Sequence, residues 1–176
     1  MTAHVRHRGS RIPAALSRLG AWLAIAAGGM MAPAPLIAQS IDEAAIGRIV
    51  DGLAEAWNAY DADAWVASFD EDSGFTNILG MHFPDRAANR ERHTALFETV
   101  FQGSRLESEL LVVRPIGDDA AVAEIRLTLT GYRGLPPGIS PTRPGVLETR
   151  LILALRETAG EWRVVAAQNT AILPPP

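Results

Sequence analysis

Apolar side chains return every three or four positions in the segment that follows residue 40, which is the spacing of one face of a helix. The residues with this spacing are Ile46, Ile49, Val50, Leu53, Trp57 and Tyr60. Just before them, Ser40 and Glu43 have the spacing of a capping box, in which a hydroxyl and a carboxylate accept hydrogen bonds from the free amides of the first turn. We predict an amphipathic helix that begins at Ser40 and packs its apolar face against the core.

A polar cluster at 70–74, DEDSG, separates a second, short helix from a strand. Asp61 stands where it can cap this helix, and Trp65 and Phe69 fall on its inner side. The cluster itself is typical of a turn, and the residues at 75–80 then have the composition of a strand. The sequence therefore predicts helix, turn and strand in that order.

A third helix and four further strands follow. Pro84 and Asp85 are typical of a helix start and Gly103 of a helix end, so this helix is expected to run through Phe101. Segments rich in Leu, Val, Ile and Thr then predict antiparallel strands. Their ranges are 106–114, 120–132, 146–157 and 161–173. Helices first and an antiparallel sheet after them predict an α+β domain in which the sheet wraps the helices.

The connection at 133–145, RGLPPGISPTRPG, is the longest between the predicted strands. It contains four prolines, which stiffen it. Long connections in compact domains usually serve a function. We expect this one to be either a lid or a clasp on a neighbouring subunit.

The first 38 residues have the organisation of a secretory signal. Four arginines between residues 6 and 18 precede an apolar, small-residue run at 21–27 and a small-residue cleavage site at Ala38. Glycines and prolines interrupt the run, which is shorter than the roughly 20 residues of a membrane-spanning helix. We predict a signal peptide at 1–38, a mature domain at 39–176, a periplasmic or secreted location and no stable membrane insertion. Leu36 is larger than ideal near the cleavage site, which leaves a retained anchor as the alternative.

The composition excludes several mechanisms. The chain has no cysteine, so thiol chemistry and disulfides are absent. All 16 basic residues are arginine, and Schiff-base catalysis needs a lysine amine. The mature part is acidic and has no basic stripe, so we expect no nucleic-acid partner.

An ordered set of short motifs spans nearly all of the mature chain. Its members are Ala56-Trp57-Asn58, Asp61, Phe69, Phe75-Thr76-Asn77 with Gly80, Arg86, His93, Phe97, Phe101 with Gly103-Ser104, Val113-Arg114, Thr149-Arg150, Trp162-Arg163 and Gln168-Asn169-Thr170. In this order they resemble the nuclear transport factor 2-like superfamily, also called SnoaL-like or cystatin-like, which includes ketosteroid isomerases. Within it, the SgcJ/EcaC family is the most similar.

This resemblance implies a fold and a kind of ligand. The fold is a cone-shaped α+β domain, with three N-terminal helices packed in a curved, mixed or antiparallel sheet. The cone leaves an apolar pocket that suits a small apolar or polyketide-like molecule. The resemblance also implies a homodimer through the outer face of the sheet.

Steroid-type isomerisation is not expected. Ketosteroid isomerases use an Asp base three residues before a strand-end glycine, together with a Tyr and a protonated Asp. The base position is occupied here by Asn77, and the Tyr position falls at about Leu53. An amide cannot accept a proton at neutral pH, so the mechanism does not carry over.

His93 is the strongest candidate for chemistry. Leu96, Phe97, Val100 and Phe101 share its helix face, which directs the imidazole toward the core. One interpretation is a buried histidine that bonds to a neighbouring carbonyl or amide. The other is a cavity-lining general acid or base, or a hydrogen bond to a ligand.

Other polar candidates lie at strand ends. Asn77 either caps a strand end or offers its amide to a bound carbonyl. Gln168 and Asn169 point to opposite faces of their strand, so one of them lines the cavity, and the upstream pattern does not decide between them. Arg126 and Arg150 alternate with leucines, which places them on the outer sheet face in ion pairs or at a dimer interface rather than as anion ligands.

Aromatic residues supply the core and the expected pocket wall. They are Trp57, Tyr60, Trp65, Phe69, Phe75, Phe97 and Phe101. We expect no metal, because His82 and His93 lie on different elements and the acidic residues at 70–72 lack ligand spacing. The sequence has no phosphate loop, serine nucleophile motif or dinucleotide fingerprint, so no cofactor is expected.

Three functions are compatible with these features. In the first, an exported protein binds a small apolar molecule, with Asn77, His93 and Gln168 or Asn169 as polar anchors. In the second, the same pocket is a cofactor-free isomerase, cyclase or hydrolase in which His93 moves a proton and Asn77 assists. In the third, the domain associates with another protein. A carboxylate beside His93 would favour catalysis, and the sequence places none there.

Overall fold

The structure, a computed structural model, describes residues 41–174. The predicted signal peptide at 1–38 and Ser40 lie outside the described residues. The elements in chain order are α1 (Glu43–Ala59), α2 (Ala62–Trp65), β1 (Phe69–Thr76), β2 (His82–Phe83), α3 (Arg86–Glu98), β3 (Arg105–Pro115), β4 (Ala120–Thr130), β5 (Val146–Thr158) and β6 (Glu161–Ala171). Within 41–174, no helix combines the length and the hydropathy needed to cross a bilayer.

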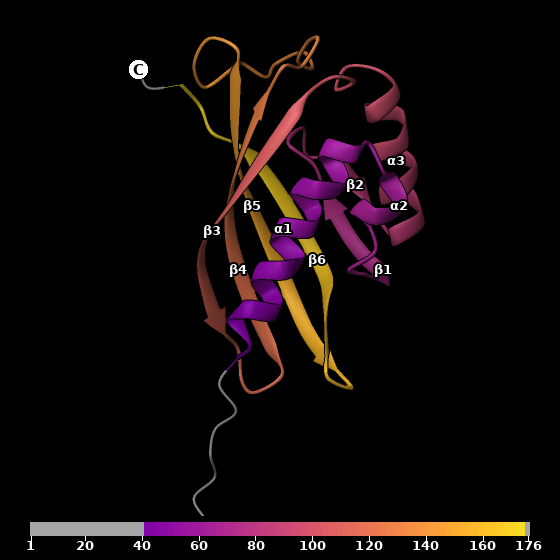
Figure 1. The fold of residues 1–176 in the computed structure, drawn as a ribbon, viewed down its shortest axis with the longest axis vertical. Helices are drawn as coiled ribbons and strands as arrows, with labels where there is room; N and C mark the ends of the chain where they lie inside the picture. Colours follow the sequence, from indigo (N-terminus) through magenta and orange to yellow (C-terminus); the bar gives the residue numbers. More distant parts are fainter. Residues whose placement is uncertain (1–40, 175–176) are drawn as a thin grey trace, which may run out of the picture. The chain divides into compact units, whose positions relative to one another are not determined.

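The strands form one mixed sheet of six strands in the order β2-β1-β6-β5-β4-β3. The four long strands pair as antiparallel neighbours, whereas β1 runs parallel to β6. The three helices gather on one side of this sheet, with α1 lying across the strands and α2 and α3 beside β1 (Figure 1). The predicted α+β architecture, with helices on one face of a mixed sheet, is confirmed.

The helix starts depend on aspartate caps. Asp61 caps α2 as predicted, because its carboxylate accepts hydrogen bonds from the amides of Asp63 and Ala64 at 3.0 and 2.9 Å. The start predicted for the first helix is wrong. Asp42, not Ser40, is the cap of α1, and its carboxylate accepts from the Ala45 amide at 2.9 Å. A second good capping residue two positions later replaced the expected one.

The segment at 69–74 differs from its prediction. Phe69 belongs to β1 and not to a helix, and α2 has only four residues. The polar cluster at 70–74 forms an irregular part of β1, where the pairing with β6 shifts between Phe69 and Gly74. The hydroxyl of Ser73 is buried there and donates to the Asp70 carbonyl at 2.6 Å. Turn-forming residues thus make a bulge within a strand, which pairing with β6 stabilises.

The third helix is shorter than predicted. Asp85 caps α3 by accepting from the Ala88 amide at 2.7 Å. The helix ends at Glu98, and turns carry the chain on to Gly103, where φ is +85°. The final turn to Phe101 that the sequence predicted as helix is therefore a turn segment that leads into β3.

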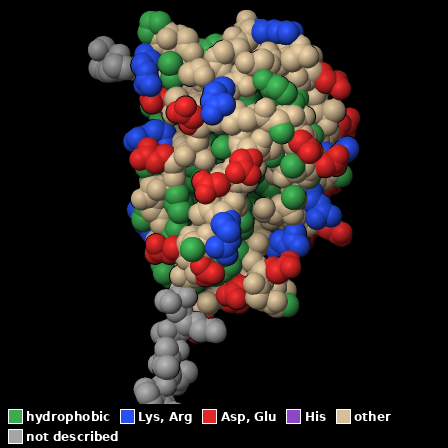
Figure 2. Space-filling model, in the orientation of Figure 1, with side chains coloured by type: hydrophobic (Ala, Val, Ile, Leu, Met, Phe, Trp, Pro, Cys, Tyr) green, Lys and Arg blue, Asp and Glu red, His purple; other side chains and the backbone are tan. Residues whose placement is uncertain are grey.

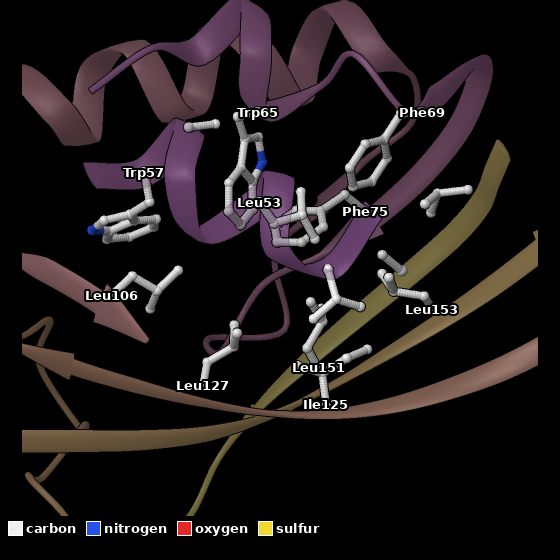
Figure 3. Packing of buried hydrophobic residues seen from close by; sticks show 14 of the residues in the cluster. Leu53, Trp57, Trp65, Phe69, Phe75, Leu106, Ile125, Leu127, Leu151 and Leu153 are labelled. Atoms are coloured by element: carbon white, nitrogen blue, oxygen red, sulfur yellow. The ribbon is translucent and has the colours of Figure 1, made fainter. Parts of the chain in front are cut away.

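The inner face of the sheet is apolar. Residues alternate between buried and half-buried along the whole of β4 and along β5 as far as Leu155. Figure 3 shows Leu127 and Leu151 of the sheet facing Trp57 and Trp65, which extend from the helices. The core therefore lies between the helices and the inward-facing side chains of β4 and β5, as the leucine pattern predicted.

The long connection between β4 and β5 is attached at both ends. The Arg133 amide donates to the Val100 carbonyl at 2.9 Å, and the Thr142 hydroxyl donates to the Ile172 carbonyl at 3.0 Å. Leu135 and Ile139 pack against the core between these attachments. The connection is thus held against the core at both ends, and its role as a lid or as a clasp on a neighbouring subunit stays a prediction.

Candidate functional site

A cavity lies between the helices and the inner face of the sheet. The space open to the centres of water molecules is about 70 Å³. Its apolar wall consists of Trp57, Trp65, Phe75, Ile78, Leu79, Leu96, Phe101, Leu106, Leu127, Leu129, Pro136, Leu147 and Leu151. Its polar residues are Asn77, Arg92, His93, Thr149 and Asn169. Among the described residues that line it, none is Asp or Glu.

His93 projects from α3 into this interior and is only 3% exposed. Its Nδ1 lies 2.9 Å from the backbone carbonyl of Asn89, one helical turn earlier. A carbonyl can only accept, so Nδ1 carries the ring proton and Nε2 remains a bare acceptor. Both interpretations of His93 hold in part, because one nitrogen bonds to a neighbouring carbonyl and the ring lines the cavity.

Four aromatic rings surround the imidazole. Trp65 stacks on it with ring centroids 4.3 Å apart, and Phe75, Phe97 and Trp57 lie at 5.5, 5.9 and 6.2 Å. The pKa of His93 is lowered to about 4, chiefly by this burial; the hydrogen bond to the Asn89 carbonyl raises it, and the charge of Arg92 contributes to the lowering. The imidazole is therefore neutral at neutral pH and is a weak base.

Asn77 has a local structural role as well as a place in the cavity wall. It follows the end of β1, and its side-chain oxygen accepts from the amides of Leu79 and Met81 at 2.9 and 3.0 Å. These bonds close the turn to β2, in which Gly80 takes φ of +76°. Because the oxygen is used in the turn, the amide nitrogen is the part of Asn77 that can bond to a ligand.

A bulge in β6 decides between Gln168 and Asn169. The pairing with β5 shifts so that Val164 lies opposite Leu155 and Ala166 opposite Ala154, which leaves Val165 as the extra residue. Before the bulge the even-numbered residues Trp162 and Val164 are buried, and after it the odd-numbered residue Ala167 is buried instead. Asn169 consequently lines the cavity, whereas Gln168 is exposed on the opposite face.

The predicted aromatic residues separate into two groups. Trp57, Trp65, Phe75 and Phe101 line the cavity, and Phe69 is fully buried in the core. Two others lie outside the cavity wall. Tyr60 is 40% exposed and donates its hydroxyl to the Ser104 carbonyl at 3.0 Å. Phe97 is buried and packs against Trp57, with centroids 5.2 Å apart.

Two polar residues of the cavity, Arg92 and Thr149, were not among the predicted site residues. Arg92 lies one position before His93 on α3, and its buried Nε has no hydrogen-bond partner within residues 41–174. Thr149 is 5% exposed, and its hydroxyl likewise has no partner there. A lone threonine in the inward leucine row of β5 was a visible signal for the second. A helical arginine gave no such signal.

The other predicted candidates lie away from the cavity. His82 of β2 bonds to the Thr76 hydroxyl at 3.2 Å, and the described residues hold no cluster of three or more His, Cys, Asp or Glu that could bind a metal. Arg126 and Arg150 lie on the outer sheet face. They form ion pairs with Glu109 and Glu124 at 2.9 and 3.8 Å, which confirms the predicted ion pairing.

Comparisons with known proteins identify the fold. No protein-family profile matches the sequence, and no curated protein is significantly similar to it. Among solved structures, an uncharacterised protein with a cystatin-like fold from Caulobacter vibrioides superimposes with a TM-score of 0.65 at 26% identity, covering 75% of this chain and 90% of that one.

Two further structures agree. A domain of unknown function with a cystatin-like fold from Nostoc punctiforme has a TM-score of 0.64 at 24% identity, covering 77% and 80% of the two chains. An NTF-2 like protein of unknown function from Shewanella oneidensis has a TM-score of 0.59 at 14% identity, covering 73% and 98%. The chain therefore has the nuclear transport factor 2-like, or cystatin-like, fold, and these similarities carry no activity with them.

Proposed function

We propose that this domain of nuclear transport factor 2-like fold is an exported small-molecule-binding protein of the SgcJ/EcaC type. The cavity between α3 and the sheet is the binding site, and its aromatic and leucine wall suits a small apolar molecule, of which a polyketide-like compound is one example. The observation that carries the proposal is the set of buried, unpartnered polar atoms that belong to residues of that wall. Trp65 Nε1, Thr149 Oγ1 and Asn169 Oδ1 have no hydrogen-bond partner within residues 41–174.

Unpartnered groups of this kind favour a ligand site. A buried polar atom without a partner costs about 1–3 kcal/mol of stability. Several such atoms around one cavity are therefore expensive for a purely structural core. A bound molecule that meets them would offset this cost.

Binding is favoured over catalysis by the chemistry of His93. With a pKa of about 4, the imidazole is neutral at neutral pH and cannot serve as the acid, and it is too weak to be an effective base. The cavity wall contributes no carboxylate that would strengthen it. In the binding role, Nε2 accepts a hydrogen bond from the ligand.

A cofactor-free isomerase, cyclase or hydrolase is the second candidate. It is supported by one observation, the bare Nε2 acceptor of His93 on the cavity wall. A ligand with a negative charge beside the imidazole would raise its pKa toward the useful range. His93→Gln separates the two functions, because it should spare binding in both and abolish turnover only in the second.

We also propose that the protein is exported and forms a homodimer, as its sequence and its resemblance to the superfamily imply. The sequence pattern of a signal peptide at 1–38 supports a periplasmic or secreted location. A homodimer would use the outer sheet face, where Arg126 and Arg150 pair with neighbouring glutamates.

A substitution that fills the cavity tests whether it is the binding site. Trp57 and Trp65 line it, so quenching of tryptophan emission by one-ring and two-ring aromatic compounds reports binding to the mature protein. Leu151 lines the cavity and its neighbour Ile152 points to the other face of the sheet. We expect Leu151→Phe to abolish quenching and Ile152→Phe to keep it. Equal quenching in both folded variants would contradict the proposed site.

A further inference from the structure

We propose that the cavity selects organic anions, and that its ligand has an apolar ring and one carboxylate held by Arg92. The inference rests on the proposed binding function and names the chemical class of its ligand. It follows from the charges and hydrogen-bonding groups around the cavity.

Arg92 is unlike the arginine two residues before it. Arg90 points outward from α3 and holds the Asp63 carboxylate with two nitrogens, one of them at 3.0 Å. Arg92 lines the cavity and makes no ion pair or hydrogen bond within residues 41–174, and its Nε is buried. A guanidinium has five donors in a planar fork that matches a carboxylate. The guanidinium of Arg92 is therefore available to bind a carboxylate at the cavity.

The charge of Arg92 is not balanced within the cavity wall. The wall contains no Asp or Glu, and its one histidine is neutral at neutral pH. Burying part of a charged group without an opposite charge is unfavourable. An anionic ligand supplies the missing charge, whereas a cationic ligand would add a second uncompensated positive charge.

Hydrogen-bond donors outnumber acceptors around the cavity. Besides Arg92, the indole nitrogen of Trp65 can only donate, and the Asn77 side-chain oxygen is already used, which leaves its amide nitrogen. Thr149 can donate as well, whereas the unpartnered atom of Asn169, Oδ1, and Nε2 of His93 are acceptors. A carboxylate accepts at about four positions, so it is the complementary group for the donors, and the two acceptors call for a donor elsewhere on the ligand.

The wall also indicates how the ligand enters. Leu79 is 40% exposed and Arg92 is half-buried, so these two lining residues reach the protein surface, whereas the lining residues Leu151 and Phe101 are buried. A water occupies at least about 10–15 Å³ of such space. The 70 Å³ therefore admit a single ring with its carboxylate at Arg92 near the protein surface.

The test compares three compounds of matched shape and different charge. Benzoate, benzamide and benzylamine are titrated into the mature protein at neutral pH by calorimetry. A hydrogen bond to a charged group contributes about 1.5–3 kcal/mol, so benzoate should bind roughly 10–150-fold more tightly than benzamide, and benzylamine most weakly. Arg92→Met should remove this preference.

Arg90→Met is the matched control, because it changes an arginine of the same helix that lies outside the cavity wall. It should keep the preference for benzoate. Equal affinity of the wild-type protein for benzoate and benzamide, or an undiminished preference in folded Arg92→Met, overturns the anion inference and leaves the binding function standing. Failure of all three compounds to bind contradicts the proposed site itself.

Discussion

Polar side chains on the two faces of the sheet differ in whether they have partners within the protein. On the outer face, arginines of β4 and β5 meet glutamates of neighbouring strands, as in Arg126 with Glu109 at 2.9 Å. On the inner face, Oγ1 of Thr149 and Oδ1 of Asn169 have no partner within residues 41–174. Adjacent residues of one strand, such as Thr149 and Arg150, thus belong to different kinds of surface.

This difference separates structural charges from candidate ligand contacts. Where the chain supplies both members of a pair, as on the outer face, the pair needs nothing else. Acidic and basic side chains are similarly interspersed over the face seen in Figure 2. Around the cavity the chain supplies polar groups without partners, and we propose that a ligand provides the partners.

The largest expected effect is the loss of a packed leucine on the inner face. Leu153 is fully buried on β5. Leu153→Ala should lower the free energy of unfolding by about 2–5 kcal/mol, because it removes buried apolar surface and leaves a void. Urea unfolding measures the change. A loss below about 1 kcal/mol would show that the inner face is loosely packed throughout, and not only at the cavity.

The pH dependence of stability tests the burial of His93. The unfolded protein takes up this proton below about pH 6.5, and the folded protein only near pH 4. The contribution of His93 is therefore complete above the unfolded pKa and is lost as the pH falls from about 6.5 to 4. The loss should be on the order of 3 kcal/mol.

Two variants isolate this effect in unfolding measurements between those pH values. His93→Gln removes the titrating group, so its stability should fall less with acid than that of the wild type. His82→Gln, on the exposed strand β2, should keep the wild-type loss. Parallel curves for the wild type and His93→Gln would mean that the imidazole is not buried as described.

A smaller gain is expected from removing an unpartnered hydroxyl. Thr149→Val replaces the buried Oγ1 by a methyl group of similar size, so the free protein should gain about 1 kcal/mol of stability. The same change should weaken the binding of benzoate. Urea unfolding and calorimetry give the two numbers. A destabilised variant would show that the hydroxyl already has a partner, and would remove Thr149 from the set of ligand contacts.

The smallest effect should come from the outer face. Arg126 and Glu109 are both well exposed, so Arg126→Ala should change the free energy of unfolding by no more than about 1 kcal/mol. Half the loss or more should disappear in high salt, since exposed ion pairs are screened. A loss above about 2 kcal/mol would place this pair in a more buried setting, such as the proposed dimer interface.

Local patterns predicted most of the fold. The four long strands and the Asp61 cap followed from alternation and from capping chemistry, which act over a few residues. The polar cluster at 70–74 was predicted as a turn and is instead part of β1. Its composition favours a turn, but pairing with the distant β6 overrides that preference.

The site was harder to predict than the fold. The choice between Gln168 and Asn169 depends on a bulge at Val165, which exists only through the register with β5. Arg92 has the composition of an exposed helical residue, and only the packing of α3 against β1 and the sheet reveals that it lines the cavity. His93 was found because four apolar residues were expected to share its helix face, of which Leu96 and Phe97 lie within α3.

Native mass spectrometry of the protein exported by its own host tests the central claim, that the cavity is a ligand site. We predict a mature chain that begins near Gln39 and retains a small molecule with an apolar ring and a carboxylate, which Leu151→Phe prevents from binding. Protein that is recovered empty, or that retains the same molecule when Leu151→Phe fills the cavity, would contradict the account.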